Sequence, residues 1–286
     1  MNVQWFPGHM TKALRMMRED IRLVDLVIEL ADARIPRAAR NPELDELGRG
    51  KARLIILNKA DLAEASVTEL WLEEMGREGI ALAVDSRDRG DMEGVRRAIS
   101  QACRERIERD KKRGIVGRRL RAMVVGIPNV GKSTFINSLA GKASARTGNK
   151  PGVTRGKQWI SLGDGAQLLD TPGVLWPRFD DEATGRDLAI IGSVNDDNLD
   201  MGELSAQLIA LMDELYPGVI EERYGLTAAA GAGDEDWPRA AALLMQIARS
   251  KSLLRSGAVP DPDRAAALLI DDLRSGRLGR VSLERP

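Results

Sequence analysis

The chain has very few of the residues that form cross-links or bind metals. Its 286 residues include one cysteine, Cys103, and one histidine, His9. A lone cysteine excludes an internal disulfide, and Cys103 lies in the charged stretch SQACRERIERD with no Cys or His neighbour to share a metal. We expect Cys103 to be a reduced thiol without a functional role.

Long hydrophobic runs are also missing. No stretch of about 18 consecutive apolar residues, the length of a membrane span, occurs. The start MNVQWFPGHM has neither the apolar core of a signal peptide nor the Arg- and Ser-rich pattern of a transit peptide. With 43% hydrophobic and 30% charged residues, the composition is that of a soluble globular protein of one or two domains. We expect a cytoplasmic, monomeric protein that does not contact a membrane.

The net charge is zero, but the charges are segregated along the chain. Residues 104–121 and 142–157 together carry fourteen basic and three acidic side chains, whereas residues 180–236 carry two basic and fifteen acidic ones. Residues 239–286 are basic again, with nine basic and five acidic side chains. The basic blocks favour a polyanionic partner, although an ordinary solvated helix surface explains any one block equally well.

Short β-rich runs alternate with helical stretches in the first 180 residues. The expected strands cover residues 24–34, 52–58, 80–86, 121–127, 157–162 and 166–170, and the expected helices cover residues 11–22, 65–78, 91–112 and 132–141. Strands separated by helices predict a three-layer α/β domain with a mostly parallel sheet. Beyond about residue 180 only helical patterns follow. We therefore expect one domain over residues 1–180 and a small all-α domain over residues 185–286.

A phosphate-binding loop is indicated by GIPNVGKST, residues 126–134, which fits the pattern G-x-x-x-x-G-K-[ST] between an expected strand and an expected helix. Gly126 and Gly131 allow the tight turn, and the backbone N–H groups with the positive end of the helix would hold the phosphates. Lys132 would reach the β- and γ-phosphate oxygens, and Ser133 would ligate Mg²⁺.

The choice between ATP and GTP is indicated by NKAD, Asn58 to Asp61, at the end of an expected strand. The Asp61 carboxylate can accept hydrogen bonds from N1–H and the exocyclic amine of guanine, whereas adenine would leave it unpaired. Asn58 would hold the loops together, Lys59 would lay its stem along the base, and Ser86 would centre the backbone contacts to guanine O6. The expected guanine-binding residues are Asn58, Lys59, Asp61, Ser86 and Arg87.

A third motif, DTPG, follows the expected strand at residues 166–170. Asp170 would hold Mg²⁺ through a water, and the Gly173 N–H would meet the γ-phosphate, so that the following loop responds to hydrolysis. In the basic stretch TGNKPGVTRG, Thr154 would be the second Mg²⁺ ligand. The expected phosphate-binding residues are Asn129, Val130, Gly131, Lys132, Ser133, Thr134 and Gly173, and the expected Mg²⁺ ligands are Ser133, Thr154 and Asp170.

The motifs occur in an unusual order, because the guanine motif at residue 58 precedes the phosphate loop at residue 126. With WFPGHM, NKAD, GIPNVGKST, PGVTRG and DTPG, the sequence resembles a circularly permuted GTPase of the ribosome biogenesis GTPase A (YlqF) family, over nearly its whole length. The resemblance implies a circularly permuted P-loop GTPase domain that hydrolyses GTP. It also implies a role in late assembly of the large ribosomal subunit, with ribosomal RNA as the main contact.

The hydrolytic machinery is incomplete in the sequence. Ras-like enzymes place a water-orienting Gln after the third motif, where this chain has Val174, so we expect slow intrinsic turnover that the ribosomal subunit stimulates. Asn129 resembles the residue that helps related GTPases hold K⁺, a further expected cofactor. His9 could orient or deprotonate water, contact RNA, or have a structural role beside Trp5 and Phe6. The expected catalytic residues are His9, Lys132 and Gly173.

Two functions remain open from the sequence. The first is the GTP-hydrolysing assembly factor, whose C-terminal arginines would bind RNA if they share a face; otherwise they cover a small solvated bundle. The second is a GTP-gated module that recruits a protein partner through the acidic stretch at residues 180–236, with hydrolysis incidental. The C-terminal basic residues that would bind RNA in the first function are Arg239, Arg249, Lys251, Arg255, Arg264, Arg274, Arg277 and Arg280.

Overall fold

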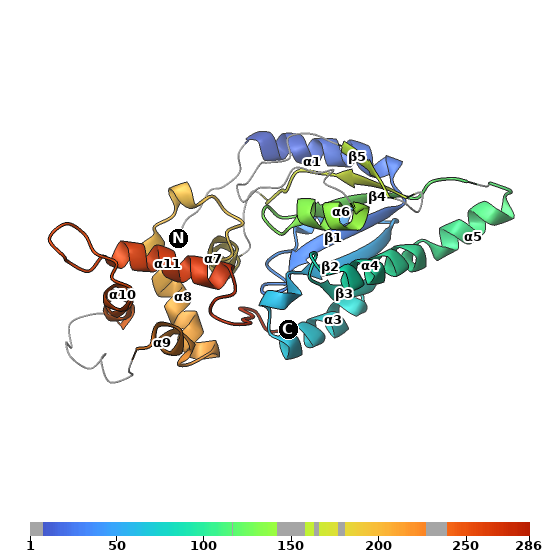
Figure 1. Ribbon diagram of the computed structural model, residues 1–286. Coiled ribbons are helices and arrows are strands. Elements are labelled where there is room, and N and C mark those ends of the chain that lie inside the picture. The colour runs from blue at the N-terminus through green and yellow to red at the C-terminus, as the bar shows by residue number, and fades with distance from the viewer. Residues whose placement is uncertain (1–7, 116, 142–157, 163–165, 177–180, 227–238) are drawn as a thin grey trace.

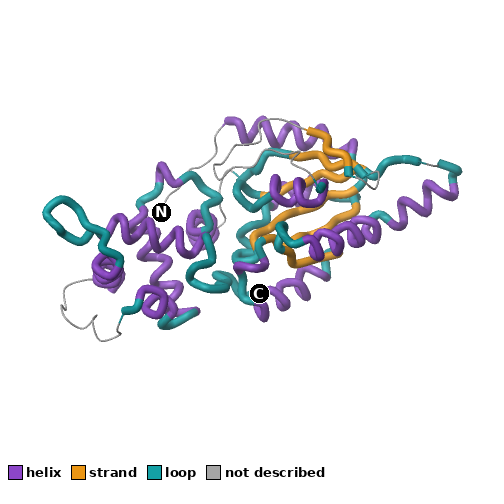
Figure 2. The backbone as a smooth tube through the Cα atoms, viewed as in Figure 1, coloured by secondary structure: helices purple, strands orange, loops and turns teal. Residues whose placement is uncertain are grey.

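A six-stranded, mostly parallel sheet forms the centre of the N-terminal part of the chain (Figures 1 and 2). The structure is a computed structural model, and it describes residues 8–115, 117–141, 158–162, 166–176, 181–226 and 239–286. The strand order is β3-β2-β1-β4-β6-β5, and only the pair β5 and β6 is antiparallel. The strands are β1 (Leu26–Asp32), β2 (Ala52–Asn58), β3 (Ile80–Val84), β4 (Arg121–Gly126), β5 (Gln158–Ser161) and β6 (Gln167–Asp170).

Helices cover both faces of this sheet because alternate residues of its central strands point to opposite sides. On β4, Met123 and Val125 pack with Leu14 of α1 (Gly8–Asp20), while Val124 belongs to the larger cluster with Phe135 of α6 (Lys132–Ala140). That larger cluster also contains buried residues of α3 (Ala65–Gly76) and α4 (Arg89–Ala102). The predicted three-layer α/β architecture is confirmed (Figure 1).

One predicted helix is wrong in its extent. The single helix expected over residues 91–112 is two helices, α4 and α5 (Arg104–Lys112), separated at Cys103. The Cys103 side chain is buried, and α4 has a continuous apolar face, whereas α5 has no buried residue. The amphipathic pattern ends at Cys103, so α5 leaves the sheet and projects from the body of the molecule (Figure 1). Burial also raises the pKa of the Cys103 thiol to about 11, which suits an inert residue.

The C-terminal part is helical and packs around α8 (Met201–Leu215) and α11 (Pro262–Arg274). Its other helices are α7 (Glu182–Ile190), α9 (Val219–Tyr224) and α10 (Arg239–Ser250). α11 begins where the sequence pattern predicts, because the Asp261 carboxylate accepts hydrogen bonds from the N–H groups of Asp263 and Arg264. The short elements in the described part of the chain are α2 (Pro42–Leu47) and three 3₁₀ helices, η1 (Ile21–Leu23), η2 (Ala60–Leu62) and η3 (Asp196–Asn198). Among the described residues no helix is both long and apolar enough to cross a bilayer.

The last residues of the chain return to the sheet-bearing part. The backbone N–H of Val281 donates to Leu62 O at 2.9 Å, and that of Leu283 donates to Arg34 O at 2.8 Å. The Glu284 carboxylate accepts hydrogen bonds from the N–H groups of Arg37 and Ala38 at 2.7 and 2.9 Å. These bonds attach the segment after α11 to the loops that follow β1 and β2.

Replacing Arg274 by Ala is expected to lower the free energy of unfolding by about 2–3 kcal/mol, because two buried carbonyls lose a charged donor. The Arg274 guanidinium donates to Ala189 O at 2.8 Å and Ile190 O at 2.9 Å, and it pairs with Asp196 at 2.6 Å. Urea unfolding followed by circular dichroism measures the change. Arg264 of the same helix is exposed and makes one carbonyl bond at 3.3 Å, so Arg264→Ala is the control. An equal loss of unfolding free energy in Arg274→Ala and Arg264→Ala would show that the carbonyl bonds of Arg274 do not stabilise the fold.

Candidate nucleotide site

The predicted motifs converge at one edge of the sheet. NKAD follows β2, GIPNVGKST follows β4 and DTPG follows β6, so all three lie at the carboxyl ends of parallel strands. The polar stretch after β1 and the residues 85–87 after β3 end at the same edge. Ligands of open α/β sheets bind at this edge, in the crevice outside the strand ends.

The phosphate loop depends on two glycines at which a side chain could not fit. Gly126 has φ +152°, and a Cβ there would lie 2.5 Å from the backbone oxygen of Leu30 on the neighbouring strand β1. Gly131 has φ +99°, and a Cβ there would lie within contact of the Asn58 amide. Glycine at both positions allows the loop to turn sharply from β4 into α6, whose first residue is Lys132, and a larger residue at either position would prevent that turn.

Lys132 is folded back over this loop. Its ammonium donates to Gly126 O at 3.0 Å and Ile127 O at 2.6 Å, and the side chain is buried. Burial lowers the pKa of Lys132 to about 7, although the nearby Asp170 carboxylate opposes that shift. The lysine therefore sits at the centre of the loop with an unusually low proton affinity.

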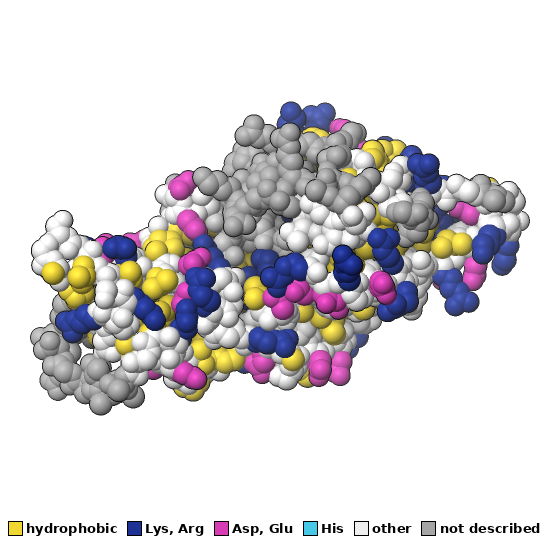
Figure 3. Space-filling model, viewed as in Figure 1, with side chains coloured by type: hydrophobic (Ala, Val, Ile, Leu, Met, Phe, Trp, Pro, Cys, Tyr) yellow, Lys and Arg dark blue, Asp and Glu magenta, His cyan; other side chains and the backbone are white. Residues whose placement is uncertain are grey.

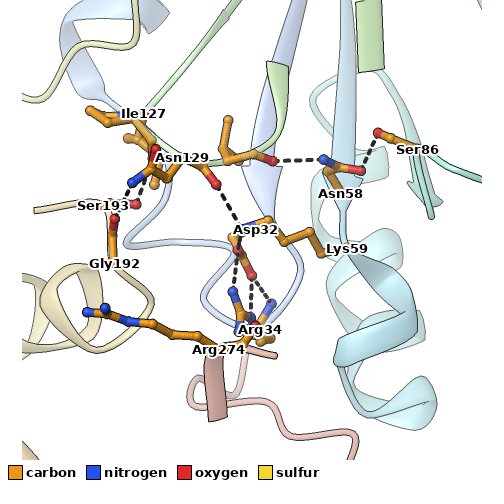
Figure 4. Close-up of polar contacts among 12 residues, drawn as sticks. Asp32, Arg34, Asn58, Lys59, Ser86, Ile127, Asn129, Gly192, Ser193 and Arg274 are labelled. Atoms are coloured by element: carbon orange, nitrogen blue, oxygen red, sulfur yellow. Dashed lines mark hydrogen bonds and ion pairs between the residues drawn. The ribbon is translucent and has the colours of Figure 1, made fainter. Parts of the chain in front are cut away.

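The guanine motif is tied directly to the phosphate loop. The Asn58 amide donates to Val130 O at 2.7 Å and accepts the Ser86 hydroxyl at 2.6 Å, so one side chain joins three loops (Figure 4). Lys59 has a left-handed backbone with φ 59°, and its ammonium donates to Asn129 O at 2.8 Å. The two Asn58 bonds are of the loop-joining kind that the sequence suggested for that residue, whereas the Lys59 bond was not expected.

Asp61 and Arg87 lie next to each other at the rim of the site. Arg87 donates to the Asp61 carboxylate at 2.6 Å and to Asp85 at 2.9 Å. The hydrogen bonds and charges of these two carboxylates raise the pKa of Arg87, which stays cationic. Asp61 is thus held by Arg87 at the end of the NKAD turn.

The structure describes two of the three residues expected to hold a divalent metal. Asp170 ends β6 with its carboxylate buried, and Ser133 lies in the first turn of α6 next to Lys132. A carboxylate and a hydroxyl are oxygen donors of the kind Mg²⁺ prefers, so these two residues fit the ion. The third expected ligand, Thr154, lies outside the described residues.

The loop after β6 packs closely on the phosphate loop. The Thr171 hydroxyl donates to Val124 O at 2.7 Å, and a Cβ on Gly173 would lie 2.8 Å from the backbone nitrogen of Pro128. Val174 is fully buried, and its N–H donates to Gly126 O at 3.3 Å. A buried valine cannot orient a water molecule. His9 belongs to α1, but its side chain lies outside the described residues, as do Trp5 and Phe6.

Several residues at this edge were missed by the sequence analysis. Asp32 ends β1, Arg34 lies two residues further on, and Gly192 and Ser193 follow α7. The Asn129 amide donates to Gly192 O at 2.7 Å, and the Ser193 hydroxyl donates to Pro128 O at 2.9 Å, so the helical part touches the phosphate loop (Figure 4). The polar residues at the end of the buried strand LVIELAD and just after it are a local signal that could have found Asp32 and Arg34, but not Gly192 or Ser193.

Four of the eight C-terminal basic residues have partners within the protein. Arg274 and Arg280 donate to backbone carbonyls at 2.7–2.9 Å, and Arg277 pairs with Asp272 at 2.5 Å. Arg239 pairs with Asp213, also at 2.5 Å. For these four residues the structure favours internal partners over a free RNA-binding surface.

The fold and the three motifs define a P-loop GTPase whose motif order is circularly permuted. The chain belongs to the ribosome biogenesis GTPase A family, because it is 39% identical to the protein of that name from Bacillus licheniformis over 100% of this chain and 99% of that one. It is also 36% identical to the mitochondrial ribosome-associated GTPase 1 of Bos taurus, over 99% of this chain and 88% of that protein.

Two further comparisons agree with this assignment. The family model described as 50S ribosome-binding GTPase matches residues 121–226. The crystal structure of GNP-bound YlqF from T. maritima is similar with a TM-score of 0.65 and 28% sequence identity, over 96% of this chain and 98% of that one. The chain is therefore a GTPase that binds guanine nucleotides and uses a divalent metal ion.

Affinity for GDP is expected to fall as the pH rises above 7. Lys132 has a pKa of about 7 without nucleotide, and bound phosphate oxygens favour its charged form, so binding above this pH takes up a proton. The dissociation constant then rises by up to about tenfold per pH unit. Calorimetry at pH 8.5 in two buffers of different ionisation enthalpy measures the uptake, and pH 6, where Lys132 is already charged, is the control. Equal proton uptake at both pH values would contradict this prediction.

Proposed function

We propose that this chain is a GTP-hydrolysing assembly factor that acts in late maturation of the large ribosomal subunit and binds ribosomal RNA in a nucleotide-dependent way. The carrying observation is the full-length similarity to ribosome biogenesis GTPase A, 39% over 100% of the chain, with all three nucleotide motifs at one sheet edge. The more distant bovine relative is named for its association with the mitochondrial ribosome.

In this proposal each motif keeps the role that its chemistry suggests. Guanine is bound by Asn58, Lys59, Asp61, Ser86 and Arg87, and the phosphates are bound by residues 129–134 and Gly173. Mg²⁺ is held by Ser133, Asp170 and Thr154, and it would neutralise charge on the phosphates. Asn129 is proposed as a K⁺ ligand, which a comparison of hydrolysis rates in KCl and NaCl tests. The protein is proposed to act as a monomer.

Slow intrinsic hydrolysis follows from the burial of Val174, which leaves the position after DTPG without a polar side chain. We propose that the ribosomal subunit stimulates turnover and that His9 is the residue it brings to the attacking water. Single-turnover hydrolysis by His9→Ala, free and with large subunits, tests this role. Unchanged rates in both conditions would leave His9 the other roles, an RNA contact or an anchor of α1.

The projecting helix α5 is the described surface that best suits RNA. Five exposed basic side chains lie on or next to it, and Figure 3 shows Lys and Arg gathered at this tip of the molecule. They are Arg104, Arg109, Lys111, Lys112 and Arg113. Basic side chains at a projecting tip can reach the phosphate backbone of a large particle with little steric hindrance.

Cosedimentation with purified large ribosomal subunits tests the proposed function. We expect binding with a non-hydrolysable GTP analogue that weakens with GDP and weakens steeply as the salt concentration rises, since RNA binding releases counterions. Equal binding in both nucleotide states would contradict nucleotide dependence. Binding to a protein partner through the acidic stretch, with no affinity for subunits, would instead support the GTP-gated module.

A further inference from the structure

A charged cluster beside the guanine motif contains two buried residues, Asp32 and Arg34, that have no role in the function described so far. Its members are Asp32 at the end of β1, Arg34 just after that strand, and Lys59 of the NKAD turn (Figure 4). Two N–H groups of Arg34 donate hydrogen bonds to the Asp32 carboxylate, each at 2.8 Å, and the Lys59 ammonium lies 3.0 Å from the same carboxylate. The side chains of Asp32 and Arg34 are 0% and 1% exposed.

The pairing with Arg34 already neutralises Asp32. A two-pronged guanidinium contact is the strongest arrangement available to a buried carboxylate, and Asp32 also accepts the backbone N–H of Arg34 at 3.2 Å. A second cation on the same carboxylate is therefore not needed to bury it. The contact instead restrains the side chain of Lys59, which directly follows the neighbouring strand β2.

Lys59 is a residue whose position requires outside support. Its left-handed backbone is uncommon for a residue other than glycine and persists where the surroundings hold it. Two contacts hold the end of its side chain, the Asp32 carboxylate at 3.0 Å and Asn129 O of the phosphate loop at 2.8 Å. With the backbone and the ammonium both held, fewer conformations are open to the aliphatic stem between them.

We propose that Asp32 is a positioning residue for guanine-nucleotide binding: held by Arg34, it fixes Lys59 so that the lysine stem forms a preformed support for the guanine base. This inference rests on the proposed base-binding role of NKAD. Without the Asp32 contact the lysine retains one anchor and must be ordered when nucleotide arrives, which weakens binding. Asp32 does not touch the nucleotide in this scheme and acts only through Lys59.

Asp32→Asn is the variant to test, and Arg34 is left unchanged. The asparagine keeps the size of the side chain and an oxygen for Arg34, but it loses the charge that attracts Lys59. Arg34 also donates to Leu273 O and Arg274 O at 3.4 Å, so replacing it would disturb the end of α11 as well. If Asp32→Asn does not fold, Asp32→Glu takes its place: it keeps a charge for Arg34, and its extra methylene shifts the carboxylate away from the position that holds Lys59 at 3.0 Å.

The experiment is a double-mutant cycle on affinity for a fluorescent GDP analogue, with wild type, Asp32→Asn, Lys59→Met and the double variant. We expect Asp32→Asn to weaken binding by about tenfold in the wild type and by less than about twofold when Lys59 is already Met, because contacting residues do not act additively. Steady-state kinetics should show a raised KM with kcat at saturating GTP nearly unchanged.

A matched control separates positioning from stability. Glu29 lies on the same strand, is 2% exposed and pairs with Arg53 at 2.5 Å and Arg40 at 3.4 Å, away from NKAD. Glu29→Gln should lower the unfolding temperature and leave affinity for the GDP analogue unchanged.

Each outcome of the cycle bears on one proposal or the other. Equal weakening by Asp32→Asn in both Lys59 backgrounds, or no weakening in either, overturns the role of Asp32. If Lys59→Met binds the analogue as wild type does, the base-binding role of Lys59 fails first. If Lys59→Met weakens binding and Asp32→Asn does not, only the inference about Asp32 fails.

Discussion

Asp61→Asn is expected to lower affinity for GDP and GTP by about 100-fold or more and to create affinity for xanthine nucleotides. The carboxylate is proposed to accept hydrogen bonds from N1–H and the exocyclic amine of guanine. An amide can accept from N1–H, but its NH₂ group then faces the amine of guanine, and two donors repel. Xanthine carries a carbonyl oxygen at that position, so the same amide pairs with it fully.

Competition of GDP and xanthosine diphosphate against a fluorescent GDP analogue measures this exchange of specificity. Asp85→Asn is the matched control, because Asp85 also pairs with Arg87, at 2.9 Å, and lies at the same rim of the site. If the Arg87 pair alone mattered, both variants would lose GDP affinity equally. We expect Asp85→Asn to change it by less than about threefold, as for an exposed ion pair.

The fold class and the nucleotide motifs were predictable because each depends on local sequence. Apolar runs such as ARLIILN become buried parallel strands, and the residues that follow them must lie at the same edge of the sheet. The glycines at 126 and 131 were identified by spacing, and the structure shows backbone and side-chain neighbours that exclude any larger residue there. The position of the site therefore follows from strand ends alone.

The contacts between distant segments could not be predicted. Asn129 meets Gly192 across 63 residues of sequence, and Arg34 meets Leu273 across 239 residues. Nothing in the local pattern says which loop the helical part will touch, because that depends on how two surfaces pack. The break at Cys103 was missed for a related reason: helical propensity continues through RERIERDKK while the buried face does not.

The contact of DTPG with the phosphate loop leads to the second large expected effect. In Gly173→Ala, the new Cβ would lie 2.7 Å from Lys132 Nζ and 2.8 Å from the backbone of Pro128. The lysine end can shift, but the Pro128 backbone cannot do so without moving the phosphate loop. The DTPG loop must therefore retreat, and its N–H at residue 173 leaves the place proposed for the γ-phosphate.

We expect Gly173→Ala to reduce GTP hydrolysis by about 100-fold while GDP affinity changes by less than about threefold, because GDP has no γ-phosphate to meet that N–H. Phosphate release and fluorescent GDP titration measure the two quantities. Gly225→Ala is the control: Gly225 is left-handed at the end of α9, with nothing within 4 Å of a Cβ, so it should lose stability but not activity. A parallel loss of GDP affinity in Gly173→Ala would mean that the phosphate loop itself had been displaced, and DTPG would then be a structural support rather than the sensor of the γ-phosphate.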